Sequence, residues 1–368
     1  MTDRRQFLQI AAGTAGLVGL TAAGCFSRAN AADQDRVEPA AKPLSILFLG
    51  GTGFIGPHQV EHALARGHQI TTFNRGRKSG YYGDRVEELT GNRDAKVDEG
   101  LAALQGDRRW DVVIDNSGYV PRHVRDSVQL LKARCRRYVY VSTVAVYPDA
   151  PGFFPEDAPL AELADPTVEQ VTGETYGPLK AECDRIVRAE LGDKATVVRP
   201  TYIVGPGDTT DRFTWWVDRI HRGGDVIGPA HADVAVQVVD VRDLAPWIVT
   251  LGENGTPGAF NAAAPAVTRA GLLWGIRATT AADVRFHWPT PAQAAELEMP
   301  APMLDWGSES AVFPWAASQA AGLSYRPLMD SALGTLQWWQ EQPAERRAKP
   351  RGWPTAEQEA AALAALAG

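Results

Sequence analysis

The stretch SILFLGGTGFIG, residues 45–56, decides the fold of this chain. Its first five residues, SILFL, form a continuous apolar run, which is typical of a strand buried on both faces of a parallel sheet. A glycine turn follows, and the apolar periodicity of residues 57–66 then predicts a helix that ends before Gly67. A second strand, HQITTFNRG, comes next. This order of strand, turn, helix and strand predicts a βαβ unit.

Three glycines at three-residue intervals, Gly50, Gly53 and Gly56, predict that the turn binds a dinucleotide. In such a turn one glycine permits the sharp bend, a second lets the backbone approach a pyrophosphate, and a third lets the helix pack close to the sheet. The first N–H groups of the helix add hydrogen-bond donors and partial positive charge for the phosphates.

The end of the second strand indicates which dinucleotide is bound. NAD-binding proteins usually carry an acid there, which bonds the ribose 2′-hydroxyl. This chain has Asn74 and Arg75 instead, with Arg77 and Lys78 close by, so that cations are available to pair with a 2′-phosphate. We therefore expect NADP rather than NAD; the alternative is that Arg75 is a surface residue.

Further strands and helices alternate along the chain. RWDVVIDNSG, RRYVYVSTVAVYPD and ATVVRPTYIVGPGD indicate strands, and residues 124–134 and 176–191 indicate helices. This alternation predicts an α/β fold with a Rossmann-type, doubly wound parallel sheet.

The predicted domain organisation follows from these elements. We expect an NAD(P)-binding domain over residues 44–200 and a smaller C-terminal α/β substrate lobe over residues 201–343, interleaved with the first domain. In this lobe Trp215 and Trp216 are adjacent, which favours core packing over contact with a substrate. Residues 344–368 are expected to be a tail with a linker and one short helix.

GETYGPLKAECD, residues 173–184, places Tyr176 four residues before Lys180, so both side chains can face one cleft from a helix. The spacing alone is common on solvated helix faces. Because Pro178 lacks an N–H group, it is expected in the first helical turn, with Thr175 as the cap. The positive end of the helix dipole would then favour a tyrosinate at Tyr176.

At this point the sequence resembles the extended short-chain dehydrogenase/reductase superfamily, the NAD-dependent epimerase/dehydratase group. The matching pieces cover residues 45 to about 265, in order: GGTGFIG, FNRG, GNRD, VIDNSG, YVSTVAVYPD, YGPLK, VVRPTYIVGPGD, VQVVDVRDLA and GAFNAAAP. Several independent pieces in the family's order make coincidence negligible, but they do not fix a substrate.

The resemblance implies roles for particular residues. Tyr176 would be the general acid/base, Lys180 would lower its pKa and hold the nicotinamide ribose, and Thr143 would hydrogen-bond the substrate oxygen. Ser142 and Arg242 would contact the substrate, although a capping or surface role for Arg242 stays open. The implied cofactor-binding residues are Gly50, Thr52, Gly53, Phe54, Ile55, Gly56, Asn74, Arg75, Asn92, Arg93, Asn116, Ser117, Gly118, Lys180 and Pro200. Asn92 stands where the family often has an acid, and Asp94 is a candidate to compensate.

The first residues of the chain resemble an export signal. Arg4 and Arg5 precede a weakly apolar run of Gly, Ala and Thr over residues 10–23, which is too short to span a bilayer. The arginine pair predicts a twin-arginine signal over residues 1–31 and a linker over residues 32–43. Cleavage after Ala31 predicts a periplasmic protein, whereas lipidation of Cys25 would tether it to a membrane.

Composition excludes several other classes. The net charge of −7 argues against a general electrostatic grip on nucleic acid. Three scattered cysteines do not make a disulfide framework or a zinc site, and no metal site is expected. The leading hypothesis is an NAD(P)-dependent oxidoreductase, epimerase or dehydratase acting on a sugar-like substrate. The alternatives are an RNA-binding relative on the same fold and a non-catalytic cofactor-binding protein.

The export signal and the family resemblance carry three further expectations. The twin-arginine translocase exports folded proteins, so a cofactor can be loaded first and is then expected to stay bound. A free sugar or glycoside is expected rather than a nucleotide sugar. Helices 124–134 and 176–191 are the equivalents of a family dimer interface, which predicts a homodimer.

Overall fold

The structure is a computed structural model that describes residues 37–304 and 307–367. The predicted export signal, including Cys25, and residues 32–36 of the predicted linker lie outside the described residues. The fold described below is that of one compact unit, which begins at Ala40. In the described part of the chain, no helix combines the length and apolarity needed to cross a membrane.

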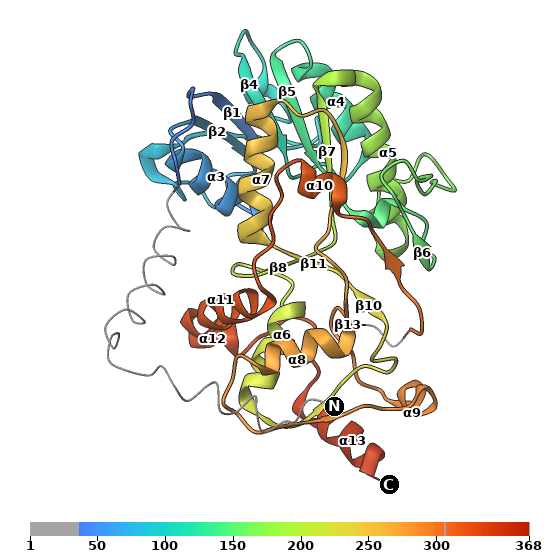
Figure 1. The fold of residues 1–368 in the computed structure, drawn as a ribbon. Coiled ribbons are helices and arrows are strands. Elements are labelled where there is room, and N and C mark those ends of the chain that lie inside the picture. Colours follow the sequence, from blue (N-terminus) through green and yellow to red (C-terminus); the bar gives the residue numbers. More distant parts are fainter. Residues whose placement is uncertain (1–36, 305–306, 368) are drawn as a thin grey trace, which may run out of the picture. The chain divides into compact units, whose positions relative to one another are not determined.

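Seven parallel strands form the central sheet, in the order β3-β2-β1-β4-β5-β7-β12 (Figure 1). The strands are β1 (Ser45–Leu49), β2 (Gln69–Asn74), β3 (Glu87–Thr90), β4 (Trp110–Asp115), β5 (Cys135–Val141), β7 (Ala195–Pro200) and β12 (Gly258–Ala262). The chain runs from β1 to one edge, returns to β4 beside β1, and continues to the other edge. The reversal between β1 and β4 is the place where doubly wound sheets bind ligands. The predicted Rossmann-type fold is confirmed.

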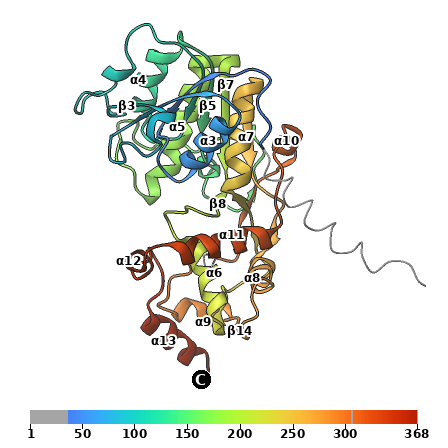
Figure 2. The ribbon, with the colours of Figure 1, turned by 90° about the vertical axis from the view of Figure 1, so that its left-hand side faces the viewer.

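Helices cover both faces of this sheet (Figures 1 and 2). Helices α3 (Ile55–Ala65) and α7 (Val241–Asn254) share a buried cluster with one face, whereas α4 (Pro121–Leu131) and α5 (Gly173–Leu191) share a cluster with the other. The predicted helices are therefore present, although each begins two or three residues earlier than expected. Pro121 can begin α4 because a proline at the first helical position loses no hydrogen bond.

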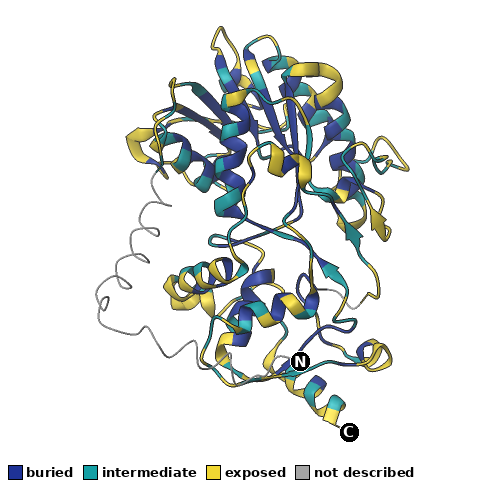
Figure 3. Ribbon diagram, in the orientation of Figure 1, coloured by how far each residue is buried: buried dark blue, intermediate teal, exposed yellow. Residues whose placement is uncertain are grey.

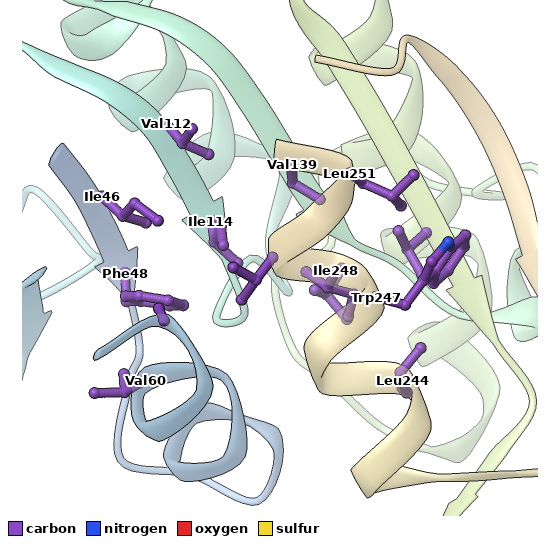
Figure 4. Packing of buried hydrophobic residues seen from close by; sticks show 14 of the residues in the cluster. Ile46, Phe48, Val60, Val112, Ile114, Val139, Leu244, Trp247, Ile248 and Leu251 are labelled. Carbon is purple, nitrogen blue, oxygen red and sulfur yellow. The ribbon is translucent and has the colours of Figure 1, made fainter. Parts of the chain in front are cut away.

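Alternation of side chains explains why the four residues after Ser45 in the first strand are all apolar. Ile46 and Phe48 pack with α3 and α7, whereas Leu47 and Leu49 pack with α4 and α5. Figure 4 shows the first of these clusters, in which Ile46 and Phe48 lie with side chains from α3, α7 and the neighbouring strands. All four side chains are fully buried, and each contributes roughly 1.5–3 kcal/mol. Figure 3 shows that burial runs along the central strands.

The C-terminal lobe consists of short strands and helices around a second core. Its elements are β8 (Tyr202–Val204), α6 (Arg212–Arg222), β9 (Gly224–Ile227), β10 (Ala235–Val236), β11 (Val238–Asp240), β13 (Val267–Thr268), α8 (Arg269–Arg277), β14 (Val284–His287), α9 (Pro291–Glu296) and α11 (Leu328–Glu341). Helix α10 (Ala316–Ala320) instead packs against β12 in the sheet layer (Figure 1). Trp215 and Trp216 are buried in the core of the lobe, as expected. Because α7 and β12 belong to the sheet layer, the lobe is interleaved with it in sequence.

One strand pair links two distant loops beside the sheet. β6 (Gly152–Phe153) pairs in parallel with β15 (Ala311–Val312). Behind this pair, Gln237 bonds the main chain of Phe313 through both its amide oxygen and its amide nitrogen. The segment around residue 313 is therefore held close to β10 and β11.

The residues from Ala344 onward are more than the tail that the sequence predicts. They form α12 (Ala344–Arg347) and α13 (Ala356–Ala367), which lie against the lobe in Figure 2. Arg346 pairs with the buried Asp211 at 2.5 Å, and Trp353 donates to the Asp211 carbonyl at 2.9 Å. The apolar periodicity of the tail could not predict these contacts, because they are polar and join segments that are distant in sequence.

Candidate active site

A cavity of about 790 Å³ lies at the carboxyl ends of the strands, where the sheet layer meets the C-terminal lobe. It is lined by segments that follow β5 and β7, by the first turns of α5, and by lobe residues. Tyr176 and Thr143, which were predicted to act together, both line it. Phe54, from the glycine turn, lines it as well, so the turn and the Tyr176 side chain share one cavity.

A close approach of two segments brings Thr143 and Tyr176 to the wall of the same cavity. Thr143 caps the short 3₁₀ turn η3 (Val144–Val146), with its side chain accepting from the N–H of Ala145 at 3.2 Å. A Cβ at Gly177 would lie 2.2 Å from the Ala145 carbonyl oxygen. Only glycine therefore lets α5 lie this close to the turn that carries Thr143.

The start of α5 differs from the prediction. The helix begins at Gly173 and its cap is Thr172, whose side chain accepts from Thr175 N while the Thr175 hydroxyl accepts from Thr172 N. Thr175 is thus the third residue of the helix. The placement of Pro178 in the first turn is wrong, because this proline lies inside the helix, in its second turn.

The ionisation of Tyr176 also differs from the expectation. Burial raises the pKa of the Tyr176 hydroxyl, and the hydrogen bond with Thr143 and the charge of Arg212 only partly oppose this rise. Lys180 is not among the groups that shift the pKa of Tyr176. The Lys180 ammonium group donates to main-chain oxygens of other segments.

Lys180 is buried among main-chain oxygens and aromatic rings. Its Nζ donates to the carbonyl oxygens of Gly118 at 2.8 Å and Val141 at 2.7 Å. It also lies 4.2 Å from the ring centre of Tyr140 and 5.1 Å from that of Tyr119. Burial lowers the pKa of Lys180 to about 8, although Cys183, Asp115 and Asp184 nearby act to raise it.

The glycine turn has the features that a dinucleotide needs. Gly50 adopts a positive φ of 86°, and a Cβ at Gly56 would lie 2.3 Å from the Gly51 carbonyl oxygen. At Gly53 a Cβ would meet no atom within 4 Å, so the backbone there faces open space. Helix α3 begins at Ile55 with no acidic residue in its first turn. These features fit a bound pyrophosphate at the turn and the first N–H groups of α3, near Thr52 and Phe54.

At the end of β2, the side chain of Asn74 is hydrogen-bonded to the main chain, whereas Arg75 is exposed. The Asn74 side chain accepts from the N–H of Gly76 at 2.8 Å, so it stabilises the chain reversal. Lys78 reaches back to the turn and donates to the carbonyl oxygen of Thr52 at 2.9 Å.

The residues after β4 support the turn from the other side. Asn116 donates its side-chain N–H to the oxygens of Gly50 and Gln59, at 3.3 and 2.6 Å. Ser117 donates to the carbonyl oxygen of Leu49 at 3.1 Å. The carbonyl of Gly118 accepts from Lys180 and from Tyr140.

Arg93 was predicted to contact the cofactor, but its side chain is used inside the protein. The guanidinium forms two bonds with the fully buried Asp115, at 2.8 and 3.0 Å, and a third with Ser127. Asn92 beside it bonds Asp98 and the N–H of Asp94. Sequence alone could not reveal that Asp115, at the end of a distant strand, faces Arg93.

Of the two predicted substrate residues, Ser142 lines the cavity and Arg242 does not. The buried hydroxyl of Ser142 has no hydrogen-bond partner. Pro200, which was predicted to contact the cofactor, lines the cavity too. Arg242 does not line it, because its guanidinium pairs with Asp240, the cap of α7, and with the Asp330 carbonyl. The capping alternative therefore describes Arg242 better than substrate contact.

Two other arginines line the cavity and were missed. Arg212 is exposed, lies over the Tyr202 ring at 5.1 Å and donates to Thr210. Arg269 is buried and donates to the carbonyl oxygen of Ala230. Neither belongs to a recognisable motif, so only the folding of the lobe identifies them.

The family follows from a comparison with known proteins. The model of the NAD dependent epimerase/dehydratase family matches residues 46–263, more than half of the chain. The chain belongs to this family. The match extends from β1 beyond β12, so it includes the glycine turn, Thr143, Tyr176 and Lys180.

Individual relatives of this epimerase/dehydratase chain differ in function. It is 27% identical over 242 residues to the chloroplast stem-loop binding protein of 41 kDa b from Arabidopsis thaliana, covering 60% of this chain and 59% of that protein. It is 30% identical over 169 residues to a UDP-glucose 4-epimerase from Neisseria meningitidis, covering 39% of this chain and 47% of that protein. The chain thus spans about half to three fifths of the length of these curated relatives.

Among solved structures, the fold is similar to that of UDP-glucuronic acid 4-epimerase from Bacillus cereus in complex with NAD. The TM-score is 0.60 at 14% sequence identity, and the match covers 82% of this chain and the whole of that chain. At this identity the likeness concerns the fold of the epimerase/dehydratase family and extends to no particular substrate.

Proposed function

We propose that the protein is an NAD(P)-dependent enzyme that transfers hydride to or from a sugar-like substrate, as an epimerase, dehydratase or reductase, with Tyr176 as its acid/base. The observation that carries this proposal is the cavity wall that Tyr176, Thr143 and Phe54 share. A dinucleotide held by the glycine turn and a substrate beside Tyr176 would meet in this one cavity.

The proposed mechanism assigns each step of proton handling to a residue. When bound, the nicotinamide dinucleotide supplies the acceptor or donor of hydride. In its tyrosinate form Tyr176 would accept the proton of the substrate hydroxyl as the carbon is oxidised, and in its protonated form it would donate a proton in the reverse direction. Thr143, which lines the same cavity, would bond the same substrate oxygen and so orient it toward Tyr176. Lys180 uses two of its three N–H donors on carbonyl oxygens, which leaves one for a ribose hydroxyl.

The cofactor is tested by mass spectrometry of the nucleotide that denatured protein releases after purification from the envelope of its native host. We expect NADP in a stoichiometric amount. An empty protein that also fails to bind NAD or NADP when they are added would contradict the proposed function.

Arg75 is proposed to select NADP by pairing with the 2′-phosphate. A charge-assisted bond at this exposed position corresponds to about a tenfold difference in Kd. We expect Arg75→Ser to weaken NADP binding by about this factor and to leave NAD binding unchanged, as measured by calorimetric titration with each dinucleotide. Equal weakening of both, or tighter NAD binding by the unmodified protein, would argue against this role.

The substrate is proposed to be an uncharged sugar or glycoside rather than a nucleotide sugar. Asp149, Glu174 and Glu309 are exposed along the cavity, and Arg212 is the exposed cation among the described lining residues. This excess of negative charge disfavours a nucleoside diphosphate. Thermal shifts with a panel of free sugars, methyl glycosides and UDP-sugars, recorded in the presence of the cofactor, test the proposal. A larger shift with the UDP-sugars would refute it.

We also propose that residues 1–31 direct export by the twin-arginine translocase, that the cofactor is loaded before export, and that the mature protein is periplasmic, or tethered if Cys25 is lipidated. Replacement of Arg4 and Arg5 by lysine should retain the protein in the cytoplasm, as shown by cell fractionation. Unchanged distribution would contradict this proposal.

A second candidate function is RNA binding, which the similarity to the chloroplast stem-loop binding protein supports. The net charge of −7 disfavours it, because RNA binding depends on contacts between cations and phosphates. A gel-shift titration with a stem-loop RNA at low salt discriminates between RNA binding and the proposed enzyme function: no shift is expected.

The predicted homodimer through α4 and α5 is checked separately by light scattering.

A further inference from the structure

The main-chain oxygens of the glycine turn are held by side chains from outside it. The Gly51 carbonyl accepts a bond from the Tyr82 hydroxyl at 2.5 Å, and the Thr52 carbonyl accepts a bond from Lys78 Nζ at 2.9 Å. Both donors come from the segment between β2 and β3, which packs beside the turn.

The two preceding carbonyls are held from the opposite side. Leu49 oxygen accepts from Asn116 N at 3.0 Å and from the Ser117 hydroxyl at 3.1 Å, and Gly50 oxygen accepts from Asn116 Nδ2 at 3.3 Å. Four consecutive carbonyl groups, from residue 49 to residue 52, therefore have donors outside the turn.

This arrangement matters because the turn is glycine-rich. Glycine has more backbone freedom than any other residue, and ordering a loop when a ligand binds lowers the affinity. In a trans peptide group the C=O and N–H bonds point in opposite directions. Fixing the oxygens of Gly51 and Thr52 toward the 76–82 segment therefore fixes the N–H groups of Thr52 and Gly53 away from it.

We propose that Tyr82 and Lys78 are positioning residues for cofactor binding: they hold the glycine turn in its binding conformation before the dinucleotide arrives. The inference rests on the proposed function, because it assigns the turn to a dinucleotide. It adds a role that is separate from that of Arg75, since these bonds act on the turn and not on the 2′-phosphate.

Tyr82, the donor to Gly51, is itself well fixed. Tyr82 is 2% exposed, and burial raises the pKa of its hydroxyl, which therefore stays protonated and donates at neutral pH. Its ring packs edge-on against the exposed Tyr81, at 4.8 Å between ring centres. The segment is also tied to β3, because Gly80 N donates to Glu88 at 2.9 Å.

The first test removes only the hydroxyl of Tyr82. Loss of one preorganising hydrogen bond corresponds to about a 3- to 10-fold increase in Kd. We expect Tyr82→Phe to weaken the binding of NAD and of NADP by this same factor, as measured by calorimetric titration. The ratio of the two Kd values should stay unchanged. Tyr81→Phe is the matched control: it removes a hydroxyl from the neighbouring residue, and its affinities should equal those of the unmodified protein.

The second test removes the cation that holds Thr52. Lys78→Met should weaken NAD binding by a similar factor, whereas Arg77→Met, which removes a neighbouring exposed charge, should not. NAD is the probe because it carries no 2′-phosphate for either cation to bind. Equal effects of the two substitutions would mean that general charge, and not the bond to Thr52, is responsible, and would overturn the role of Lys78.

A measurement without ligand completes the design. Hydrogen exchange of the amides of residues 52–55 should be faster in Tyr82→Phe than in Tyr81→Phe, because the turn opens more often. If the unmodified protein binds a dinucleotide and Tyr82→Phe binds it equally well, the inference alone fails. If the unmodified protein binds neither NAD nor NADP, the proposed function fails and the inference with it.

Discussion

Replacing Tyr176 by phenylalanine is expected to lower kcat by a factor of about 100 to 10,000, while the affinity for the dinucleotide stays unchanged. The substitution keeps the ring, so the packing of α5 against η3 is retained. It removes the hydroxyl that is proposed to act as the acid/base at the cavity. The measurement is a comparison of turnover on the first sugar that the substrate screen identifies, together with titration of the cofactor.

Tyr202→Phe is the matched control for this prediction. Tyr202 also lines the cavity, but it is exposed, begins β8 and has Arg212 over its ring. Its loss of a hydroxyl should change kcat far less than the substitution at Tyr176. A Tyr176→Phe variant with normal turnover would remove Tyr176 from the mechanism and leave the cofactor site intact.

Replacing Arg199 by methionine is expected to lower the free energy of unfolding by about 3–5 kcal/mol. Arg199 and Asp184 are both fully buried and pair at 2.9 Å. The guanidinium also donates to the Tyr147 hydroxyl and to the Glu156 carbonyl, both at 2.8 Å. Without Arg199, the carboxylate of Asp184 stays in the core without this cation, which is the main cost. Urea unfolding at neutral pH gives the measurement.

Two variants separate this effect from general loss of charge. Arg222→Met breaks an exposed pair with Asp218 and should cost less than about 1 kcal/mol. The double variant Arg199→Met with Asp184→Leu removes both buried charges and should recover much of the loss. A loss below about 1 kcal/mol in Arg199→Met would show that water or movement of the chain compensates the Asp184 carboxylate.

The local pattern of the sequence determined the sheet layer. The apolar run Ser45–Leu49 predicts a doubly buried strand because successive side chains of a strand face opposite layers, and each layer here is hydrophobic. The glycines at positions 50 and 56 were predictable for a similar reason. A positive φ and a contact too close for a Cβ are local requirements that only glycine meets.

The resemblance to the family pointed to Thr143 and Tyr176, which lie after a strand and near the start of a helix, and the fold brings both to one cavity. The sequence could not give the surroundings of Lys180. The spacing from Tyr176 to Lys180 allows both to face one cleft, but the carbonyls of Gly118 and Val141, from other elements, hold the ammonium group.

Only the tertiary structure decided which charged residues are available for chemistry. Arg93 and Arg242 looked like ligand-binding residues, yet Asp115 and Asp240 engage them, whereas Arg212 and Arg269, which have no motif, line the cavity. The physical reason is that a charged side chain inside a protein takes the partner that best compensates its lost hydration. The sequence determines which elements form, and the packing of those elements determines which partner each charge meets.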